Sequence, residues 1–520
     1  MKGTMILYLF FMALLPILWL VIALGIFRMA AWQACPVALL LALMASAEVF
    51  GMPWGYTATA ALEGSALACW PILLIIIATI YTYHLSVHTK GIDTIKEMLE
   101  SVSMDSRVLI LLIGFGFGGF LEGMAGFGTA IAIPASMLAG MGIHPITSVA
   151  VCLIANFVPS AYGSIGIPLV TLAGVMGANA SEIATYVALQ LLILAILCPF
   201  LMVIVTGRSL RALKGMAPIC IAAGLSYSLA QLIVSYAMGP ELAGVAGSIL
   251  TMGAIIGTVR LFPVENEEFR MPEREASPRI PFRKALMAWL PFLLIFIFLL
   301  LTSKLVPVVY ESLILFQTSI LIYQGEGGVP YTFYWIATPG TIIFFAAFLS
   351  GFIQKIPLPD MLRVLGKTIV SLRFTIITII TIIATAKVMG YSGMTTTIAD
   401  MTVAATGTMY PFIAAFIGSV GGFITGSATS TCILLGKLQM DAAIAIGASP
   451  AVQAWVAAAN ATGACAGKLI APQSIAIGIA AIGAAGVGSE SKLFSLTMKI
   501  YIPFILMLGC IVYFGQYLIQ

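Results

Sequence analysis

The sequence predicts an all-α polytopic membrane protein with about 12 crossing helices, two re-entrant hairpins and two inverted repeats. Hydrophobic residues make up 61% of the 520 residues and charged residues only 8%, whereas a soluble domain has roughly 25% charged residues. The mean hydropathy is +1.10. The apolar segments are long and continuous, unlike the short alternating strands of a membrane β-barrel. This composition excludes a soluble enzyme, a disordered protein and a nucleic-acid-binding protein.

Ten apolar runs have lengths near the roughly 20 residues that cross a hydrocarbon core of about 30 Å. They are 4–27, 32–50, 58–84, 183–206, 216–237, 241–262, 286–302, 338–353, 368–390 and 496–518. The net charge of +4 comes mostly from Lys and Arg in the loops between runs. Positive loops follow 183–206 and 338–353, and a third lies within 263–285. The positive-inside rule places all three in the cytoplasm.

The segment 263–285 carries the densest charge in the chain. We interpret it as a solvated cytoplasmic linker between an N-terminal half, 1–262, and a C-terminal half, 286–520.

Two further apolar regions, 107–175 and 409–487, are rich in Gly, Pro and small polar residues, and they resemble each other. Gly-Gly-Phe at 118–120 recurs at 421–423, an offset of 303 residues. At an offset of 304, an asparagine and then a proline also recur; the pairs are Asn156 with Asn460 and Pro168 with Pro472. The same order at nearly the same spacing predicts an internal repeat.

Counting membrane crossings orients the two repeats. We expect the first to contain a re-entrant hairpin at about 107–143 and a broken helix at 146–175. The second has its hairpin at about 409–447 and its broken helix at 450–487. Six crossings separate the repeats, so the second hairpin enters from the opposite side of the membrane. Inverted repeats with a binding site at broken helices are typical of secondary transporters.

The second hairpin carries a run of hydroxyl side chains beside a glycine pair. The amino end of a half-helix has unpaired N–H groups and partial positive charge, which favour an anion. We therefore expect a substrate anion near the hairpin tip and the two repeated asparagines. The candidates are Ser427, Thr429, Ser430, Asn156 and Asn460. Small residues also serve helix packing, which is the alternative role for each single glycine.

Charged residues inside the membrane cost roughly 2.5–3.5 kcal/mol each on insertion scales, so each needs a reason. We predict Glu122 as the proton-coupling carboxylate, because burial favours the uncharged, protonated form of a carboxyl group. The alternative for Glu122 is a structural ion pair or a cap of the hairpin. Lys468 is the preferred cation for a substrate carboxylate. Lys387 and Lys437 are alternatives, although the i, i+4 spacing of Lys437 from Asp441 favours an ion pair between those two.

The sequence predicts neither a metal site nor an enzyme. All eight cysteines lie in apolar stretches without a C-x-x-C pair, and the three histidines are scattered. A membrane enzyme needs a catalytic constellation and a passive anion channel needs rings of like charge; we find neither. We also find no G-x-x-x-x-G-K-[ST] loop for ATP-driven transport. We therefore expect a carrier without cofactors.

Several stretches resemble the lactate permease family. They are G-G-F-L-E-G-M-A-G-F-G-T (118–129), C-L-I-A-N (152–156), G-S-I-G-I-P (163–168), Y-S-G-M (391–394), G-S-A-T-S (426–430), A-N-A-T-G (459–463) and G-K-L-I-A-P-Q-S-I-A (467–476). The resemblance implies a proton-linked carrier of L-lactate, D-lactate and glycolate, multi-pass in the bacterial plasma membrane (the inner membrane). It also implies inverted repeats, paired hairpins and elevator-type transport, which by analogy favours a homodimer.

The resemblance also implies which residues line the substrate path. It points to Glu122–Thr129, Gly426–Thr431 and Lys468–Gln473, and thereby adds Gly123, Gly126, Gly426 and Gln473 to the predicted site. Two positions depart from the family pattern, since Ala130 stands where Pro is frequent and Ala428 where Asn is frequent. The loss of an amide at the hairpin tip keeps an alternative open: a sodium-coupled carrier of another organic anion. In either case the partners are a small organic anion and the lipid bilayer, not nucleic acid.

Overall fold

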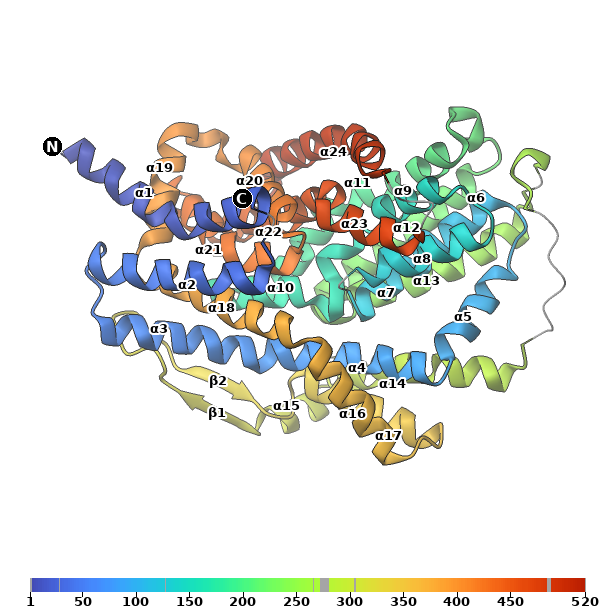
Figure 1. Cartoon of the computed structure of the whole chain (residues 1–520), viewed down its shortest axis with the longest axis horizontal. Coiled ribbons are helices and arrows are strands. Elements are labelled where there is room, and N and C mark those ends of the chain that lie inside the picture. The colour runs from blue at the N-terminus through green and yellow to red at the C-terminus, as the bar shows by residue number, and fades with distance from the viewer. Residues whose placement is uncertain are drawn as a thin grey trace.

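The computed structural model describes the chain except for residues 1, 28, 127, 265, 272–279, 304, 484–487 and 520. Within the described residues, 12 helices are long and apolar enough to cross a membrane. The only strands in this part of the chain form one two-stranded antiparallel ribbon. The prediction of an all-α polytopic membrane protein with about 12 crossing helices is confirmed (Figure 1).

The first half of the chain contains thirteen α-helices and five short π or 3₁₀ segments, labelled η, among its described residues. In order they are α1 (Lys2–Leu20), η1 (Val21–Ile26), α2 (Ala31–Glu48), α3 (Trp54–Leu67), η2 (Ala68–Leu73), α4 (Leu74–His88), α5 (Gly91–Glu100), α6 (Ser106–Leu109), η3 (Ile110–Phe117), α7 (Gly118–Met124), α8 (Thr129–Gly140), α9 (Pro145–Ala155), η4 (Pro159–Tyr162), α10 (Gly163–Met176), α11 (Ala180–Gly207), η5 (Leu210–Leu213), α12 (Ala217–Ala237) and α13 (Pro240–Leu261).

The second half begins with η6 (Glu267–Phe269). It continues with α14 (Phe282–Leu301), α15 (Pro307–Ile314), β1 (Gln317–Ile320), β2 (Tyr331–Tyr334), α16 (Pro339–Ile353), α17 (Leu358–Ser371), α18 (Arg373–Tyr391), α19 (Met394–Thr406), η7 (Gly407–Met409), α20 (Tyr410–Thr425), α21 (Ala428–Ala445), α22 (Pro450–Ile470), α23 (Pro472–Ala481) and α24 (Glu490–Ile519). The predicted run 338–353 forms only the 15-residue α16, which is shorter than a full span.

Each Gly-rich region contains two helical arms joined by a short turn. In the first region α6, η3 and α7 run on to Met124, and α8 returns from Thr129. In the second region α20 ends at Thr425 and α21 starts at Ala428. The arms pack against each other in both cases. The left-handed residues Gly126 and Gly426 make the turns, a conformation that glycine adopts without steric cost.

Each of these hairpins is followed by a broken helix. Between α9 and α10 the chain passes through η4, and Ser164, Ile165 and Gly166 adopt left-handed conformations. Between α22 and α23 the helix bends by 50° at Ala471. Pro472 follows directly, and its ring cannot continue the helical hydrogen-bond ladder. Residues 484–487 of the predicted 450–487 segment lie outside the described residues.

The hairpins and broken helices of the two regions interlock. The returning arm α8 packs on α23, and the returning arm α21 packs on α10. Thus each hairpin contacts the second half-helix of the other region. This packing brings the two hairpin turns and the breaks of the two broken helices together near the middle of the molecule (Figure 1). A further correspondence lies ahead of the hairpins, where left-handed Lys90 precedes α5 and left-handed Gly393, 303 residues later, precedes α19.

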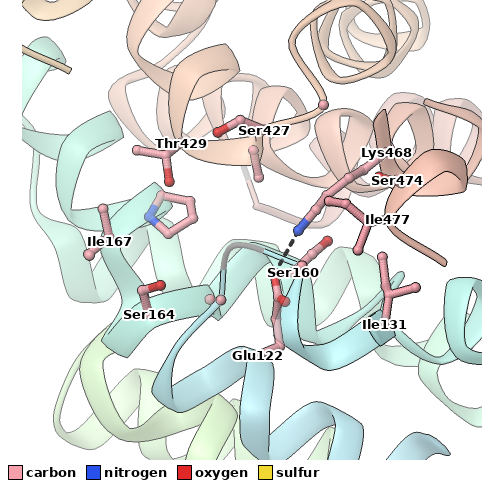
Figure 2. A pocket seen from close by; sticks show the side chains of 16 residues that line it. Glu122, Ile131, Ser160, Ser164, Ile167, Ser427, Thr429, Lys468, Ser474 and Ile477 are labelled. Carbon is pink, nitrogen blue, oxygen red and sulfur yellow. Dashed lines mark hydrogen bonds and ion pairs between the residues drawn. The ribbon is translucent and has the colours of Figure 1, made fainter. Parts of the chain in front are cut away.

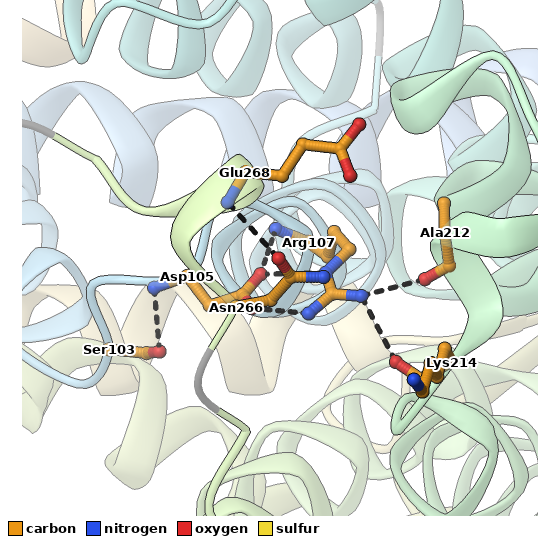
Figure 3. Close-up of polar contacts among 7 residues, drawn as sticks. All are labelled: Ser103, Asp105, Arg107, Ala212, Lys214, Asn266 and Glu268. Carbon is orange, nitrogen blue, oxygen red and sulfur yellow. Dashed lines mark hydrogen bonds and ion pairs between the residues drawn. The ribbon is translucent and has the colours of Figure 1, made fainter.

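The start of the charged linker docks onto the first hairpin (Figure 3). The amide of Met271 donates to the Met104 carbonyl at 2.8 Å. Next to this contact, the fully buried Arg107 forms a two-pronged ion pair with Asp105 and donates to the carbonyls of Ala212 and Lys214. The predicted linker 263–285 is therefore anchored at its described beginning, and its segment 272–279 lies outside the described residues.

Candidate functional site

The two hairpin turns and the two broken helices surround a cavity of about 210 Å³ (Figure 2). A water molecule occupies roughly 30 Å³ in the liquid, so this space suits an organic acid of a few heavy atoms. The lining residues are Glu122, Gly126, Gly128, Ile131, Ser160, Gly163, Ser164, Ile167, Pro168, Gly426, Ser427, Ala428, Thr429, Lys468, Ser474 and Ile477. Both hairpin tips and both broken helices contribute to the wall.

A buried ion pair crosses the cavity wall between the two halves of the chain. Lys468 Nζ, in the last turn of α22, donates to Glu122 Oε1 of α7 at 2.7 Å. The side chains are 12% and 2% exposed. The second carboxylate oxygen, Oε2, is buried without a hydrogen-bond partner among the described residues. Gly163 makes room for this carboxylate, because a Cβ there would lie 3.0 Å from Oε1.

The wall facing this pair carries an N-terminus rich in hydrogen-bond donors. Ser427 caps α21, since its Oγ accepts from the amide of Ser430 at 3.2 Å. The amides of Ala428 and Thr429 begin the helix and have no acceptor within it. The Thr429 hydroxyl lies at the cavity in Figure 2. The helix dipole adds partial positive charge at this end, so the wall favours an anion.

The first broken helix supplies two more hydroxyl groups. Ser164 Oγ donates to the Ala125 carbonyl at 2.8 Å and so ties the first hairpin tip to the break in α10. Ser160 Oγ donates to the Phe157 carbonyl at 3.0 Å. Position 126 requires glycine beside this hydrogen bond, because a Cβ there would overlap the Ser164 hydroxyl.

Three isoleucines complete the cavity: Ile131, Ile167 and Ile477. They give the wall an apolar portion next to the charged and hydroxyl-bearing portions (Figure 2). A molecule with one carboxylate, one hydroxyl group and a small alkyl group matches these three surfaces.

The structure brings six of the predicted site residues to the cavity: Glu122, Gly126, Gly426, Ser427, Thr429 and Lys468. The others lie elsewhere. Gly123 faces Val245 of α13. The Asn460 amide donates to the Thr431 carbonyl at 3.1 Å and so joins α22 to α21. Ser430 is buried in the first turn of α21.

Asn156 and Gln473 also lie outside the cavity lining. Asn156 ends α9, and its buried Oδ1 has no hydrogen-bond partner among the described residues. The Gln473 side chain donates to the Ile424 carbonyl at 3.2 Å and lines a neighbouring cavity instead. Of the path predicted along Glu122–Thr129, Phe127 lies outside the described residues.

Sequence reasoning missed the residues that the first broken helix contributes, above all Ser160 and Ser164. A signal for Ser164 was present, because the repeat offset of 304 pairs it with Lys468. The isoleucines had no such signal, since apolar residues fill the entire chain.

Two other ion pairs within the membrane helices lie away from the cavity. Lys437 Nζ lies 2.7 Å from Asp441 Oδ1, as the i, i+4 spacing predicts. Lys387 Nζ lies 3.0 Å from Glu63 Oε1, which also accepts from the Tyr391 hydroxyl. Across the described ranges, no group of three His, Cys, Asp or Glu side chains is placed to hold a metal ion.

A helical membrane protein whose broken helices enclose a small, charged cavity belongs to the class of membrane transporters. A profile of the L-lactate permease family matches residues 9–519. The chain belongs to this family.

The chain is 41% identical to the L-lactate permease of Streptococcus iniae over 87% of this chain and 94% of that protein. It is 32% identical to the glycolate permease GlcA of Escherichia coli K12 over 97% and 95% of the two chains. Among solved structures, the YdaH transporter of Alcanivorax borkumensis aligns over 87% of this chain and 98% of that chain, with 14% identity and a TM-score of 0.35, too low to equate the folds.

Proposed function

We propose that the protein is a secondary active transporter that imports small 2-hydroxy monocarboxylates with protons across the plasma membrane. L-lactate, D-lactate and glycolate are the proposed substrates, in line with the names of the L-lactate and glycolate permeases that it resembles. The observation that carries this proposal is the Glu122–Lys468 ion pair in the wall of a small cavity.

The substrate carboxylate is proposed to bind Lys468 and the free amides at the start of α21. Thr429 and Ser427 line the same wall, and their hydroxyl groups add hydrogen-bond donors for the carboxylate. The 2-hydroxyl group then meets the serines of the first broken helix, and the alkyl group meets the isoleucines. The polar groups of the substrate thereby exchange hydrogen bonds with water for hydrogen bonds with the protein, and its alkyl group packs on apolar side chains.

Charge balance supplies the coupling in this proposal. In the empty site, Lys468 and Glu122 neutralise each other. An anion alone leaves a net negative charge in a low-dielectric site, and a proton alone leaves a net positive charge; both are costly. When the anion binds Lys468 and a proton binds Glu122, the site is neutral again. Only the empty site and the doubly loaded site are then free to move.

A proton fits this carboxylate better than sodium does. The Lys468 ammonium group already occupies Glu122 Oε1 and repels a second cation, whereas a proton requires only Oε2, which has no partner among the described residues. Sodium-coupled transport of another organic anion is the alternative. It draws support from the departure at Ala428, which lines the cavity.

A larger cavity of about 1000 Å³ gives the proposed route to the cytoplasm. It shares Gly426 with the substrate cavity, and Gln473 lies at this boundary. Its other walls include Ala30, at the turn between α1 and α2, and Glu490, at the start of α24. Both positions are cytoplasmic in the predicted topology of inverted repeats and re-entrant hairpins, for which a homodimer is the proposed assembly.

Uptake of radiolabelled L-lactate into proteoliposomes tests this function. An imposed pH gradient, acidic outside, is compared with an imposed sodium gradient at equal pH. We expect accumulation above equilibrium with the pH gradient and none with sodium alone. Accumulation only with sodium would favour the alternative, and no uptake of L-lactate, D-lactate or glycolate by folded protein would refute the proposed substrates.

A further inference from the structure

A further cavity lies away from the substrate cavity, between α5, α13 and α14. Here the structure contains a groove of about 770 Å³. Its walls are mostly apolar and include Val102, Ile249, Met252, Ile256, Leu286 and Trp289. The groove is long enough along α13, from Ile249 to Arg260, to hold the upper part of a hydrocarbon chain.

One cation at the rim of this groove has no counter-charge among the described residues. Arg260, in the last turn of α13, lines the groove, is exposed, and has no ion-pair or hydrogen-bond partner among the described residues. The acid on the opposite wall, Glu97, lies 3.8 Å from Lys284 of α14 and is balanced by it. Arg283 adds a further exposed positive charge at the start of α14. Among the described residues, the rim therefore carries more positive than negative charge.

The groove lies at the level of the cytoplasmic leaflet. The end of α13 and the start of α14 flank the linker 263–285, which the positive-inside rule places in the cytoplasm. Trp289 lies two turns into α14. Tryptophan is enriched at membrane interfaces, which fits a position of Trp289 near the lipid headgroups. The amphipathic α5 closes the groove, with Ile92, Ile95 and Leu99 buried.

We propose that this groove binds an anionic phospholipid, with an acyl chain along α13 and the phosphate group on Arg260. Basic pockets between helices on the cytoplasmic side are suited to anionic lipid headgroups. The excess of positive charge at the rim favours an anionic over a zwitterionic lipid, and the apolar walls favour a lipid over free phosphate. This proposal is independent of the transported substrate.

The bound lipid would touch the part of the molecule that holds the substrate cavity. On its other side, α13 packs against α7, which carries Glu122, and against α10. The lipid thus lies between two sets of helices. One set is α7, α10 and α13, and the other is α5 and α14, which contact each other. Occupancy of the groove stabilises the arrangement of these helices by linkage, as any ligand of the folded state does.

Thermal unfolding of the purified full-length protein in detergent tests the proposal. Phosphatidylglycerol, phosphatidylcholine or inorganic phosphate is added to wild-type protein, Arg260→Gln and the control Arg211→Gln, whose exposed arginine is outside the groove. We expect phosphatidylglycerol to raise the melting temperature more than phosphatidylcholine does in wild type and control, and this difference to fall by at least half in Arg260→Gln.

A second variant, Ile256→Trp, fills the groove without changing charge. We expect it to retain less co-purified phospholipid than wild type, measured by native mass spectrometry. The proposal is overturned if Arg260→Gln keeps the full difference between the two lipids, if wild type shows none, or if inorganic phosphate alone reproduces the shift. Unchanged lipid retention in Ile256→Trp would equally contradict it.

Discussion

Glu122 and Lys468 are separated by 346 residues, yet their side chains form a hydrogen-bonded ion pair between the two Gly-rich regions at the cavity. Removing one partner of a buried ion pair typically costs about 3–5 kcal/mol, because the other charge is left unpaired. Removing both costs far less. We therefore propose distinct roles for the two residues, in which Lys468 holds the anion and Glu122 holds the proton that compensates it.

Lys468→Met is expected to abolish substrate binding. The variant removes the one cation among the described residues that line the cavity. We expect the affinity for L-lactate to fall at least a hundredfold, measured by scintillation proximity binding on purified protein. Lys437→Met is the matched control, since Lys437 pairs with Asp441 away from the cavity. An equal loss in both variants would contradict the assigned role.

Ser164→Ala is expected to weaken binding moderately. The change removes the hydrogen bond from Ser164 to the Ala125 carbonyl and one hydroxyl group from the cavity. A hydrogen bond contributes about 1 kcal/mol net, so we expect a loss of roughly fivefold in affinity for L-lactate. Ser136→Ala, which removes an exposed hydroxyl group on α8, serves as the control. Wild-type affinity in Ser164→Ala would exclude this serine from the site.

The helix pair α20–α22 holds the second hairpin against its broken helix, and glycines set the distance between them. Gly418, Gly422, Gly463 and Gly467 each face the backbone of the partner helix so closely that a Cβ would overlap it. Such small residues allow close packing of membrane helices. The same contact orients Lys468, one residue beyond Gly467, toward the cavity.

Gly463→Ala is expected to destabilise the protein. A Cβ at this position would overlap the Ala415 carbonyl of α20, and overpacking of this kind costs about 1–3 kcal/mol. We expect a lower melting temperature in detergent and reduced lactate uptake. In the control, Gly366→Ala on α17, a Cβ would meet nothing within 4 Å, and the higher helix propensity of alanine should leave stability unchanged or raised. An unchanged melting temperature for Gly463→Ala would contradict this packing account.

The positions of the hairpin turns and helix breaks were predictable from sequence, whereas the ion pair between Glu122 and Lys468 was not. Proline at 472 and the glycines around 126 and 426 mark the breaks, because the backbone chemistry of these residues is local. The i, i+4 pair of Lys437 and Asp441 was predictable for the same reason. The partner of Glu122 depends on how distant helices pack, and no local pattern encodes it.

The same limit explains which predicted site residues lie outside the cavity lining. Asn156 and Asn460 recur in the repeat, but Asn156 ends α9, and the Asn460 amide ties α22 to α21. The β1–β2 ribbon was also not predicted, because its strands have four residues each and lie between apolar runs. The substitution of Ala130 for the frequent proline has no structural explanation, and its side chain is buried within α8.

For the whole molecule, charge balance at the cavity predicts electroneutral transport. The empty and the doubly loaded sites carry the same net charge, so neither movement transfers charge across the membrane. We expect a pH gradient to drive L-lactate accumulation in proteoliposomes, and a potassium diffusion potential set with valinomycin to drive none. Accumulation driven by the potential alone would mean that more than one proton moves with each substrate.

The proposed coupling requires that Glu122 carries the transported proton, and L-lactate transport by Glu122→Gln in proteoliposomes tests this role. The neutral glutamine imitates protonated Glu122, so the loaded site stays neutral, but the empty site leaves Lys468 unpaired. We predict that exchange of external radiolabelled L-lactate for internal L-lactate continues near the wild-type rate, while accumulation driven by a pH gradient is lost. If Glu122→Gln accumulates L-lactate against its gradient as wild type does, Glu122 is not the coupling residue.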